Sequence, residues 1–481
     1  MADNNFNLGI LQGRKHIHFI GIGGSGMYPI AQILCSKGYE LSGSDNNETE
    51  TLQAVRNMGC KVYMGQRAEN IEGAELIVYT AAIMSDNPEL VAARESGVPV
   101  MERSEILGLI SSWYQNAICI SGTHGKTTAT SMLTQIFVEA GEDISCVIGG
   151  KLKAIGGGSG RAGRSDTFVC ESCEFEDHYL KLHPDVAVIL NVDADHLDYF
   201  KNLDNIKKSF RNFASLASRC LIINGDDLNT VEAVAGLDKE IITFGFNEKN
   251  DYYAKILGSK GLRTDFEVFR KGEPLGQMSV HVPGRHNVLN ATAATAAAML
   301  SGVDVKTIKT ALEKFPGAGR RFEKMACADG VTVVDDYAHH PTELEAVLTA
   351  AKSLDFNRVW AVFQPFTYSR TEILMDDFAR VLKIADKVVL TDIMGSREKN
   401  TNRIYTRQLA EKIEDCVFFD VADEIADAQT AERKEANFDE IISYLLENLE
   451  EGDLVITLGC GDAYKLAKRL GKKLEEREKE R

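Results

Sequence analysis

GTHGKTT, residues 122–128, stands between an apolar run over residues 116–121 and a helical pattern over residues 129–140. This order predicts a β-strand, a glycine loop and an α-helix, which together cradle nucleotide phosphates. Glycines let backbone N–H groups converge on phosphate oxygens, Lys126 supplies a mobile cation, and the Thr127 hydroxyl can hold Mg²⁺. The sequence therefore predicts a site for ATP or a related nucleotide, formed by Gly122, Thr123, His124, Gly125, Lys126, Thr127 and Thr128.

This loop is shorter than the standard phosphate-binding pattern. That pattern requires a glycine where this chain has Ile120, so the loop here follows G-x-x-G-K-T-T. The shorter form narrows the class of nucleotide-binding proteins to which the chain can belong. The alternative is a structural glycine turn that happens to precede Lys-Thr, but the flanking strand and helix patterns favour the phosphate loop.

The length of 481 residues exceeds what one hydrophobic core supports, and about 150 residues per domain suggests three domains. Strand and helix patterns alternate in three blocks, which predicts an α/β fold with parallel sheets throughout. We expect a Rossmann-like N-terminal domain over residues 1–113, a central phosphate-loop ATPase domain with a parallel sheet over 114–322, and a Rossmann-like C-terminal domain over 323–481.

The composition limits the partners of the chain. A net charge of −17, from 71 acidic and 54 basic residues, argues against nucleic acid. No apolar run is long enough to span a bilayer and no signal-peptide pattern stands at the start, so we expect a cytoplasmic protein without membrane insertion. Among the 10 cysteines, which we expect to be reduced, Cys170 and Cys173 have C-x-x-C spacing. Buried thiols are the main interpretation there, with a zinc or redox site as the alternative.

A second glycine motif lies near the N-terminus. A strand pattern over residues 16–20 leads into GIGGSG at 21–26 and a helical pattern over 27–37, and Asp45 ends the next strand pattern. The motif is G-x-G-x-x-G, and Asp45 has the spacing of a ribose-binding carboxylate, so the block predicts a site for a nucleotide diphosphate. Glycines that serve only strand-to-helix packing are one alternative. A nicotinamide-binding oxidoreductase domain is another, although nothing in the sequence would serve hydride chemistry.

Polar side chains follow two strand patterns of the central block. Glu171 and Glu174 follow one, and His196 follows the other. Because the carboxyl ends of parallel strands meet at the edge where the phosphate loop lies, we expect Thr127, Glu174 and His196 to bind Mg²⁺. A histidine bonded to a neighbouring carbonyl is the alternative for His196. The glycine-rich residues 155–160 are expected to form a mobile surface loop.

The third block places titratable residues after its first two strand patterns. DDYAHHPT, residues 335–342, follows the first, and Arg370 follows the second. A cluster of this kind suits substrate handling, and an arginine can clamp a carboxylate or phosphate through two parallel hydrogen bonds. Taken one at a time, these stretches are also compatible with solvated loops.

Together these motifs resemble the Mur ligases of peptidoglycan synthesis over nearly the whole chain. The family-wide marks are the loop 122–128, Glu174, Asn191 with Asp195-His196-Leu197-Asp198, and Gly284-Arg285-His286-Asn287. The marks of the alanine-adding branch are residues 21–27, His124, Arg320-Arg321-Phe322-Glu323 and residues 336–342.

The resemblance implies an enzyme that uses ATP and Mg²⁺ to join L-alanine to the lactyl carboxylate of UDP-N-acetylmuramate through an acyl phosphate. It implies that the first domain binds the UDP part of the sugar nucleotide rather than NAD. The implied catalytic residues are Lys126, Glu174, His196, His339 and Arg370. The implied ATP contacts, besides the phosphate loop, are Asn287, Arg321 and Asp336. The implied sugar-nucleotide contacts are Gly21, Gly23, Gly24, Ser25, Gly26, Met27, Asp45, Arg103, Tyr337 and His339.

The chain departs from the family pattern in two places. Many members have D-E-S-D where this chain has Cys173-Glu174-Phe175-Glu176, which leaves Glu171 as a second metal-ligand candidate. Phe366 and Thr367 stand where many members have histidine and arginine. Within the family, attachment of a preformed peptide remains the alternative activity, and outside it a regulatory ATP-binding module remains. The sequence leaves the oligomeric state open.

Overall fold

The computed structural model describes residues 9–395, 398, 400–401, 403–419 and 431–480, with only the backbone described at 198 and 431–436. It contains three sheets in two compact units. The first unit comprises residues 1–257, 265–280 and 287–316, and the second comprises 258–264, 281–286 and 317–481. The α/β class with parallel-rich sheets is confirmed. The three domain boundaries expected from the sequence remain a prediction.

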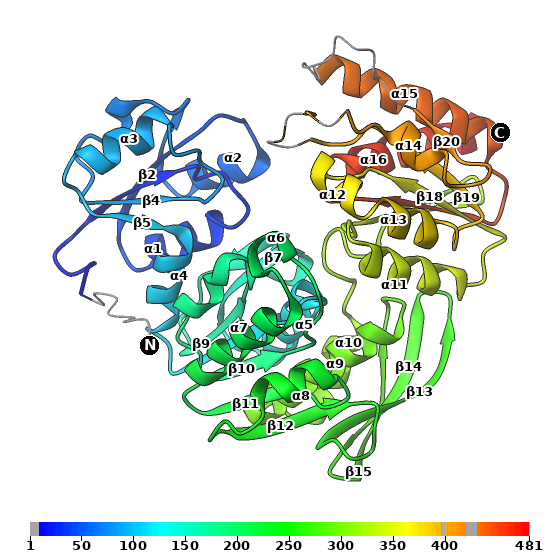
Figure 1. Cartoon of the computed structure of the whole chain (residues 1–481). Helices are drawn as coiled ribbons and strands as arrows, with labels where there is room; N and C mark the ends of the chain where they lie inside the picture. Colours follow the sequence, from blue (N-terminus) through cyan, green and yellow to red (C-terminus); the bar gives the residue numbers. More distant parts are fainter. Residues whose placement is uncertain (1–8, 396–397, 399, 402, 420–430, 481) are drawn as a thin grey trace. The chain divides into compact units, whose positions relative to one another are not determined.

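The N-terminal sheet has the strand order β3-β2-β1-β4-β5 with parallel pairings, as in a Rossmann-like domain (Figure 1). Its strands are β1 (His16–Ile20), β2 (Glu40–Asp45), β3 (Lys61–Met64), β4 (Leu76–Tyr79) and β5 (Val100–Glu102). Its helices are α1 (Tyr28–Ser36), α2 (Glu50–Asn57), α3 (Pro88–Glu95) and α4 (Arg103–Ser111), with a 3₁₀ turn, η1 (Ala68–Ile71).

The central sheet has ten strands in the order β15-β14-β13-β12-β11-β10-β6-β9-β7-β8. Its first strands are β6 (Asn116–Ser121), β7 (Ser145–Leu152), β8 (Gly158–Arg161), β9 (Thr167–Glu171) and β10 (Val186–Ile189). The others are β11 (Cys220–Asn224), β12 (Glu240–Gly245), β13 (Tyr252–Lys260), β14 (Arg263–Arg270) and β15 (Glu273–Val280). The helices are α5 (Lys126–Glu139), α6 (Leu197–Phe200), α7 (Leu203–Leu216), α8 (Leu228–Val234), α9 (Arg285–Leu300) and α10 (Val305–Glu313), with η2 (Lys153–Ile155) and η3 (Phe175–Lys181).

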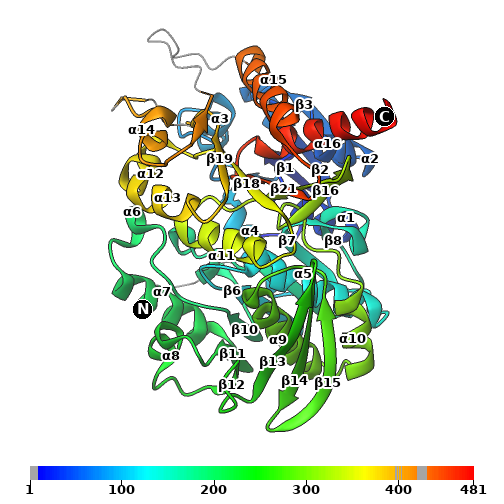
Figure 2. The same ribbon diagram turned by 90° about the vertical axis from the view of Figure 1, so that its right-hand side faces the viewer.

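The glycine-rich segment differs from its prediction. Residues 158–160 belong to β8, which pairs antiparallel with β7 at the sheet edge. The Ser159 hydroxyl is buried and donates to the Ser25 carbonyl at 2.9 Å, so the segment packs on the loop before α1. The expectation of a surface loop was therefore wrong for these residues. The strands β13, β14 and β15, which lie side by side in Figure 2, were also missed.

The third sheet, in the second unit, has the order β16-β17-β21-β18-β19-β20, and only β16 runs antiparallel to its neighbour. Its strands are β16 (Glu323–Ala328), β17 (Val331–Asp336), β18 (Arg358–Phe363), β19 (Lys387–Leu390), β20 (Val417–Phe418) and β21 (Asp453–Leu458). Its helices are α11 (Pro341–Lys352), α12 (Tyr368–Ile373), α13 (Met375–Leu382), α14 (Thr406–Ala410), α15 (Ala431–Asn448) and α16 (Ala463–Glu480).

The core is apolar in the way that parallel sheets covered on both faces require. One buried cluster runs from the N-terminal sheet into the central sheet, and two others pack on the third sheet. Tyr114, between the first two sheets in sequence, stacks on Phe168 with ring centroids 4.9 Å apart. Among the helices of the described residues, none combines the length and apolar character needed to cross a membrane.

Gly108 lies where α4 packs closely against η3 within the first unit. A Cβ atom at this position would collide with the carbonyl oxygen of Lys181 in η3, whereas one at Gly258 in β13 would meet open space. We expect Gly108→Ala to lower the free energy of unfolding by about 1–3 kcal/mol, because backbone must move to admit the methyl group. Urea unfolding followed by circular dichroism measures it, and an equal loss in Gly258→Ala would contradict the packing argument.

Candidate functional site

The phosphate loop lies where the sequence predicts it, between β6 and α5. Gly122 and Gly125 have φ of 140° and 86°, in the region that favours glycine. A Cβ atom at Gly125 would lie 2.6 Å from Oδ1 of Asn290, so the loop backbone packs directly on α9. The positive φ of Gly125 turns the chain into the first turn of α5, whose N-terminal N–H groups suit anions.

The side chain of Asn191, which follows β10, fixes the middle of this loop. Its Oδ1 accepts from the backbone N–H of His124 at 2.8 Å, and its Nδ2 donates to the His124 carbonyl at 3.0 Å. The Thr123 N–H donates to the Asn191 carbonyl at 3.1 Å. These three hydrogen bonds fix the backbone of the loop at Thr123 and His124.

Lys126 forms a buried ion pair with Glu174. Its Nζ lies 2.9 Å from the carboxylate and donates to the carbonyls of Gly122 and Thr123 at 2.6 and 3.0 Å. The two side chains are only 15% and 4% exposed. Burial lowers the pKa of Lys126, but Glu174 offsets this and the net shift is upward, so the ammonium stays charged. The sequence predicted both residues at the site but not their pairing.

Glu171 occupies the position next to the Thr127 hydroxyl. The Thr127 Oγ1 donates to Glu171 at 2.9 Å, and the Gly149 N–H donates to the other carboxylate oxygen at 2.6 Å. His196 lies farther away, with Nε2 3.9 Å from Glu174, and its ring packs 4.9 Å from that of Phe175. The structure therefore brings Thr127 beside Glu171, and Glu174 between Lys126 and His196. The side chain of Asp198 lies outside the described residues.

These donors fit a hard divalent cation. Carboxylate and hydroxyl oxygens with one imidazole are the ligands that Mg²⁺ accepts in proteins. In the described residues, however, no three His, Cys, Asp or Glu side chains already converge as a metal cage. A cation here would share its coordination with phosphate oxygens, as Mg²⁺ usually does. The assignment of Thr127, Glu174 and His196 as ligands stays a prediction, with Glu171 as the additional donor.

The C-x-x-C pair does not form a disulfide. Cys170 and Cys173 are both free, and burial raises the pKa of the Cys173 thiol to about 11. A thiol with such a pKa stays protonated and unreactive at neutral pH. The geometry agrees with buried thiols beside useful carboxylates.

Three N–H groups of the N-terminal glycine loop are held by the end of β2. Gly21 and Ile22 donate to the Ser44 carbonyl at 2.9 and 3.0 Å, and Gly23 donates to Oδ2 of Asp45 at 2.9 Å. The Arg103 side chain would lie 3.4 Å from a Cβ atom at Gly26. The structure thus brings together the predicted diphosphate-site residues of the first unit, which are Gly21, Gly23, Gly24, Ser25, Gly26, Met27, Asp45 and Arg103.

The adjacent arginines of the second unit have different environments. Arg320 forms an ion pair with the fully buried Asp335 at 3.0 Å, and its guanidinium lies between the rings of Tyr337 and Tyr464. It also donates to two carbonyls of the loop after β21. Arg321 is 30% exposed and lies 4.0 Å from a carboxylate oxygen of Glu343. Arg321 also lies over the Tyr337 ring, 5.2 Å from its centroid. Arg320 therefore has a structural role, and a contact of Arg321 with ATP stays a prediction.

Asp336 holds the main chain around these arginines. Its two oxygens accept from the N–H groups of Phe322 and Ala338, at 2.7 and 2.8 Å. Burial raises the pKa of this carboxyl to about 6. Because both oxygens already bind backbone, the geometry gives Asp336 a positioning role toward its neighbours, and direct contact with ATP stays a prediction.

His339 is half-buried, near Glu343 and Arg370. Burial lowers the pKa of its imidazole; the negative charge of Glu343 opposes this shift and the positive charge of Arg370 adds to it, with a net lowering. Nδ1 lies 3.0 Å from the Tyr337 carbonyl, which can only accept, so Nδ1 carries the proton of the neutral ring and Nε2 is its acceptor atom. Tyr337 packs edge-on to this ring at 5.5 Å. Asn287, by contrast, belongs to the first unit, where it accepts from Asn290.

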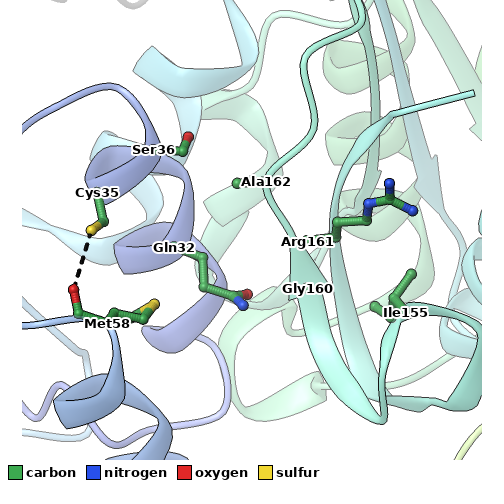
Figure 3. A pocket seen from close by; sticks show the side chains of 8 residues that line it. All are labelled: Gln32, Cys35, Ser36, Met58, Ile155, Gly160, Arg161 and Ala162. Carbon is green, nitrogen blue, oxygen red and sulfur yellow. Dashed lines mark hydrogen bonds between the residues drawn. The ribbon is translucent and has the colours of Figure 1, made fainter.

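A separate cavity of about 410 Å³ lies in the first unit beside α1. In Figure 3, the Gln32 side chain points toward Gly160, and the Cys35 thiol faces the Met58 carbonyl, 3.8 Å away. The lining contains none of the predicted site residues and consists of Gln32, Cys35, Ser36, Met58, Ile155, Gly160, Arg161 and Ala162.

A phosphate loop in a parallel-rich central sheet, together with Rossmann-like sheets before and after it in sequence, defines a multidomain nucleotide-dependent enzyme. Three family models match the chain. They are the Mur ligase family catalytic domain over residues 16–115, the Mur ligase middle domain over 120–298, and the Mur ligase glutamate ligase domain over 320–461. The chain belongs to the Mur ligase family, which confirms the resemblance predicted from its motifs.

Similar proteins cover nearly the full length. A UDP-N-acetylmuramate–L-alanine ligase of Caldanaerobacter subterraneus is 44% identical over 97% of this chain and 98% of its own. One of Agathobacter rectalis is 43% identical over 95% of this chain and 98% of its own. The crystal structure of a UDP-N-acetylmuramate–alanine ligase from Thermotoga maritima has a TM-score of 0.79 at 26% identity, covering 96% of this chain and all of that one.

The contrast between the two arginines gives a paired prediction. We expect Arg320→Ala to lower the free energy of unfolding by about 3–5 kcal/mol, because Asp335 would stay buried without its cation. Arg321→Ala, the adjacent comparison, should lower it by less than Arg320→Ala does, because its ion pair with Glu343 is long and partly exposed. Urea unfolding measures both, and similar losses in the two variants would refute the separate roles.

Proposed function

We propose that this chain is an ATP-dependent ligase that joins L-alanine to the lactyl carboxylate of UDP-N-acetylmuramate. The products are UDP-N-acetylmuramoyl-L-alanine, ADP and phosphate, in the synthesis of peptidoglycan. The observation that carries the proposal is the phosphate loop with Lys126 and Thr127 beside two strand-end carboxylates. It stands in a chain that matches relatives of this name over nearly its whole length. Because the reaction consumes ATP, we place it in the cytoplasm.

In the first step, an oxygen of the lactyl carboxylate attacks the γ-phosphorus of ATP, and the bond to the β–γ bridging oxygen breaks. The products are an acyl phosphate and ADP. This activation is needed because a carboxylate is a poor electrophile and hydroxide is a poor leaving group. Lys126 stabilises the charge on the transferred group, since its flexible stem lets the ammonium turn from Glu174 and the loop carbonyls toward a phosphate oxygen.

Mg²⁺, when bound, would offset phosphate charge during this step, and Thr127, Glu171, Glu174 and His196 supply the donors that suit it. Asn191 keeps the loop ordered, so little reorganisation accompanies nucleotide binding. In this proposal Asn287 and Arg321 contact ATP, and the diphosphate of the sugar nucleotide binds the loop 21–27 beside Asp45 and Arg103.

In the second step, the amine of L-alanine attacks the acyl carbon and phosphate leaves as the C–O bond breaks. The attacking nitrogen must lose a proton. His339 suits this role, because the lowered pKa of its imidazole favours the neutral ring and its Nδ1–H···O=C bond leaves Nε2 as the accepting atom. Arg370 is assigned to a carboxylate or phosphate group of the reactants, which its guanidinium can clamp. Tyr337 contributes to the sugar-nucleotide side.

The experiment that tests the proposal measures phosphate release from ATP and Mg²⁺ with UDP-N-acetylmuramate and one acceptor at a time. We expect release, and a product heavier by one alanine residue, only when L-alanine is present. Release with L-Ala-D-Glu-diaminopimelate alone would instead identify a ligase for preformed peptides. The murein peptide ligase of Psychrobacter arcticus, which is 24% identical with a TM-score of 0.71, has the same fold as this chain. No release with any acceptor would reject the proposal.

Variants of the central site separate the roles of the two glutamates. We expect Lys126→Ala and Glu174→Ala each to lower kcat by at least about 1,000-fold, since the first removes a cation from the transferred phosphoryl group and the second removes a proposed ligand of Mg²⁺. Glu232→Ala is the control, because that carboxylate lies on the surface in an ion pair with Lys207. A Mg²⁺ titration of kcat completes the test. Full activity in Glu174→Ala, with loss in Glu171→Ala, would transfer the metal role to Glu171.

A further inference from the structure

A buried polar chain crosses the N-terminal sheet next to the glycine loop. His18 and Glu89 are both 0% exposed, and the His18 Nε2 lies 2.7 Å from the Glu89 carboxylate. The Ser44 hydroxyl donates to the other oxygen of Glu89 at 2.5 Å. On its far side, His18 Nδ1 lies 2.8 Å from the Ser42 hydroxyl, which lies 2.8 Å from His16 Nε2.

The far end of this chain is anchored to the main chain. The His16 Nδ1 bonds to the Gly73 carbonyl at 2.8 Å, and because a carbonyl can only accept, this nitrogen is the donor. The two imidazoles and the Ser42 hydroxyl thus link the Glu89 side chain to the backbone of Gly73.

Such a chain is costly to bury and specific in geometry. A buried ion pair contributes little net stability compared with apolar residues of similar size, but it fixes the groups that bond to it. Glu89 lies in the first turn of α3, where the helix dipole favours a negative charge. Its carboxylate accepts from the hydroxyl of Ser44, near the end of β2. The side chain of Glu89, which belongs to α3, is therefore held by β1 through His18 and by β2 through Ser44.

The end of β2 in turn sets the glycine loop. The carbonyl of Ser44 accepts from Gly21 and Ile22, and the carboxylate of the next residue, Asp45, accepts from Gly23. Three consecutive N–H groups of the loop are thus held by two residues at the end of β2, Ser44 and Asp45. The side chain of Ser44 is in turn hydrogen-bonded to Glu89.

We propose that Ser44, Glu89 and His18 are positioning residues for the sugar-nucleotide site. The carboxylate, anchored by His18, holds Ser44 and Asp45 in the register that presents the loop to the diphosphate of UDP-N-acetylmuramate. The inference rests on the proposed function, because it assigns that ligand to the loop. Ser42 bonds to His18 on the side away from Glu89, so its loss leaves the contacts among His18, Glu89 and Ser44 in place.

Two serine variants of the same strand test the inference. Ser42 and Ser44 are both buried, and each loses one hydroxyl in the change to alanine. We expect Ser44→Ala to raise the KM for UDP-N-acetylmuramate roughly tenfold, with the KM for ATP within about twofold of wild type. Ser42→Ala should leave both KM values within about twofold, although both variants lower the thermal midpoint.

A second variant tests the carboxylate itself. Glu89→Gln keeps the shape of the side chain, but its amide cannot accept from both His18 and Ser44. It should raise the KM for the sugar nucleotide as Ser44→Ala does. Equal KM changes in Ser42→Ala and Ser44→Ala, or an equal rise in the KM for ATP, would overturn the inference and show a structural role only.

Calorimetric titration of the full chain with UDP-N-acetylmuramate separates failure of the inference from failure of the proposed function. Binding by wild type without phosphate release would reject the ligase proposal, and the dissociation constants of the three variants would still test the positioning role. If wild type does not bind the sugar nucleotide at all, both statements fail. Binding and turnover in wild type, with unchanged constants in Ser44→Ala, would reject the inference alone.

Discussion

In all three sheets, a carboxylate at the carboxyl end of a parallel strand accepts backbone N–H groups from a neighbouring segment. Asp45 of β2 accepts from Gly23, Glu171 of β9 accepts from Gly149, and Asp336 of β17 accepts from Phe322 and Ala338. Hydrogen bonds to an ionised acceptor are stronger than neutral ones, so each carboxylate fixes backbone groups that lie beyond the paired residues of its sheet. The arrangement of the candidate sites depends on these three anchors.

The central site adds a cation to the same arrangement. Lys126 is bound by Glu174 and by two loop carbonyls, so its charge is balanced while the nucleotide is absent. Burying this pair is costly, and pairs of this kind are poor sources of stability. The pair suits the proposed chemistry because each partner can also bind a reactant. The ammonium of Lys126 can bind a phosphate oxygen in place of Glu174, and the carboxylate of Glu174 can bind a metal ion in place of Lys126, which apolar side chains could not do.

The sequence was sufficient to predict the parts of the candidate sites that consist of a strand, a glycine loop and a helix in direct succession. The loops at 21–26 and 122–128 and their flanking elements were predicted, because the conformations needed there restrict the residue types. What the sequence could not supply were contacts between segments distant along the chain. The pairing of Lys126 with Glu174 and the hydrogen bond of Thr127 to Glu171 arise from sheet order. Of the strands that were missed, β14 alternates regularly, with Thr264, Phe266 and Val268 buried, so its signal was present and was overlooked. The burial patterns of β13 and β15 do not alternate, so the signal of these two strands is weak.

Two adjacent arginines show how one residue can be anchored beside another. In the second unit, Arg320 forms a short ion pair with the buried Asp335 and lies against two tyrosine rings, whereas Arg321 has a longer ion pair with Glu343 and also lies over the Tyr337 ring. A side chain that is held by several contacts restricts the φ and ψ angles of its own residue, and therefore the direction in which its neighbour points. The contact with ATP that is proposed for Arg321 would then cost less conformational entropy. The motif assigned that contact to Arg321, but the anchoring of Arg320 comes from residues distant along the chain, which only the three-dimensional contacts identify.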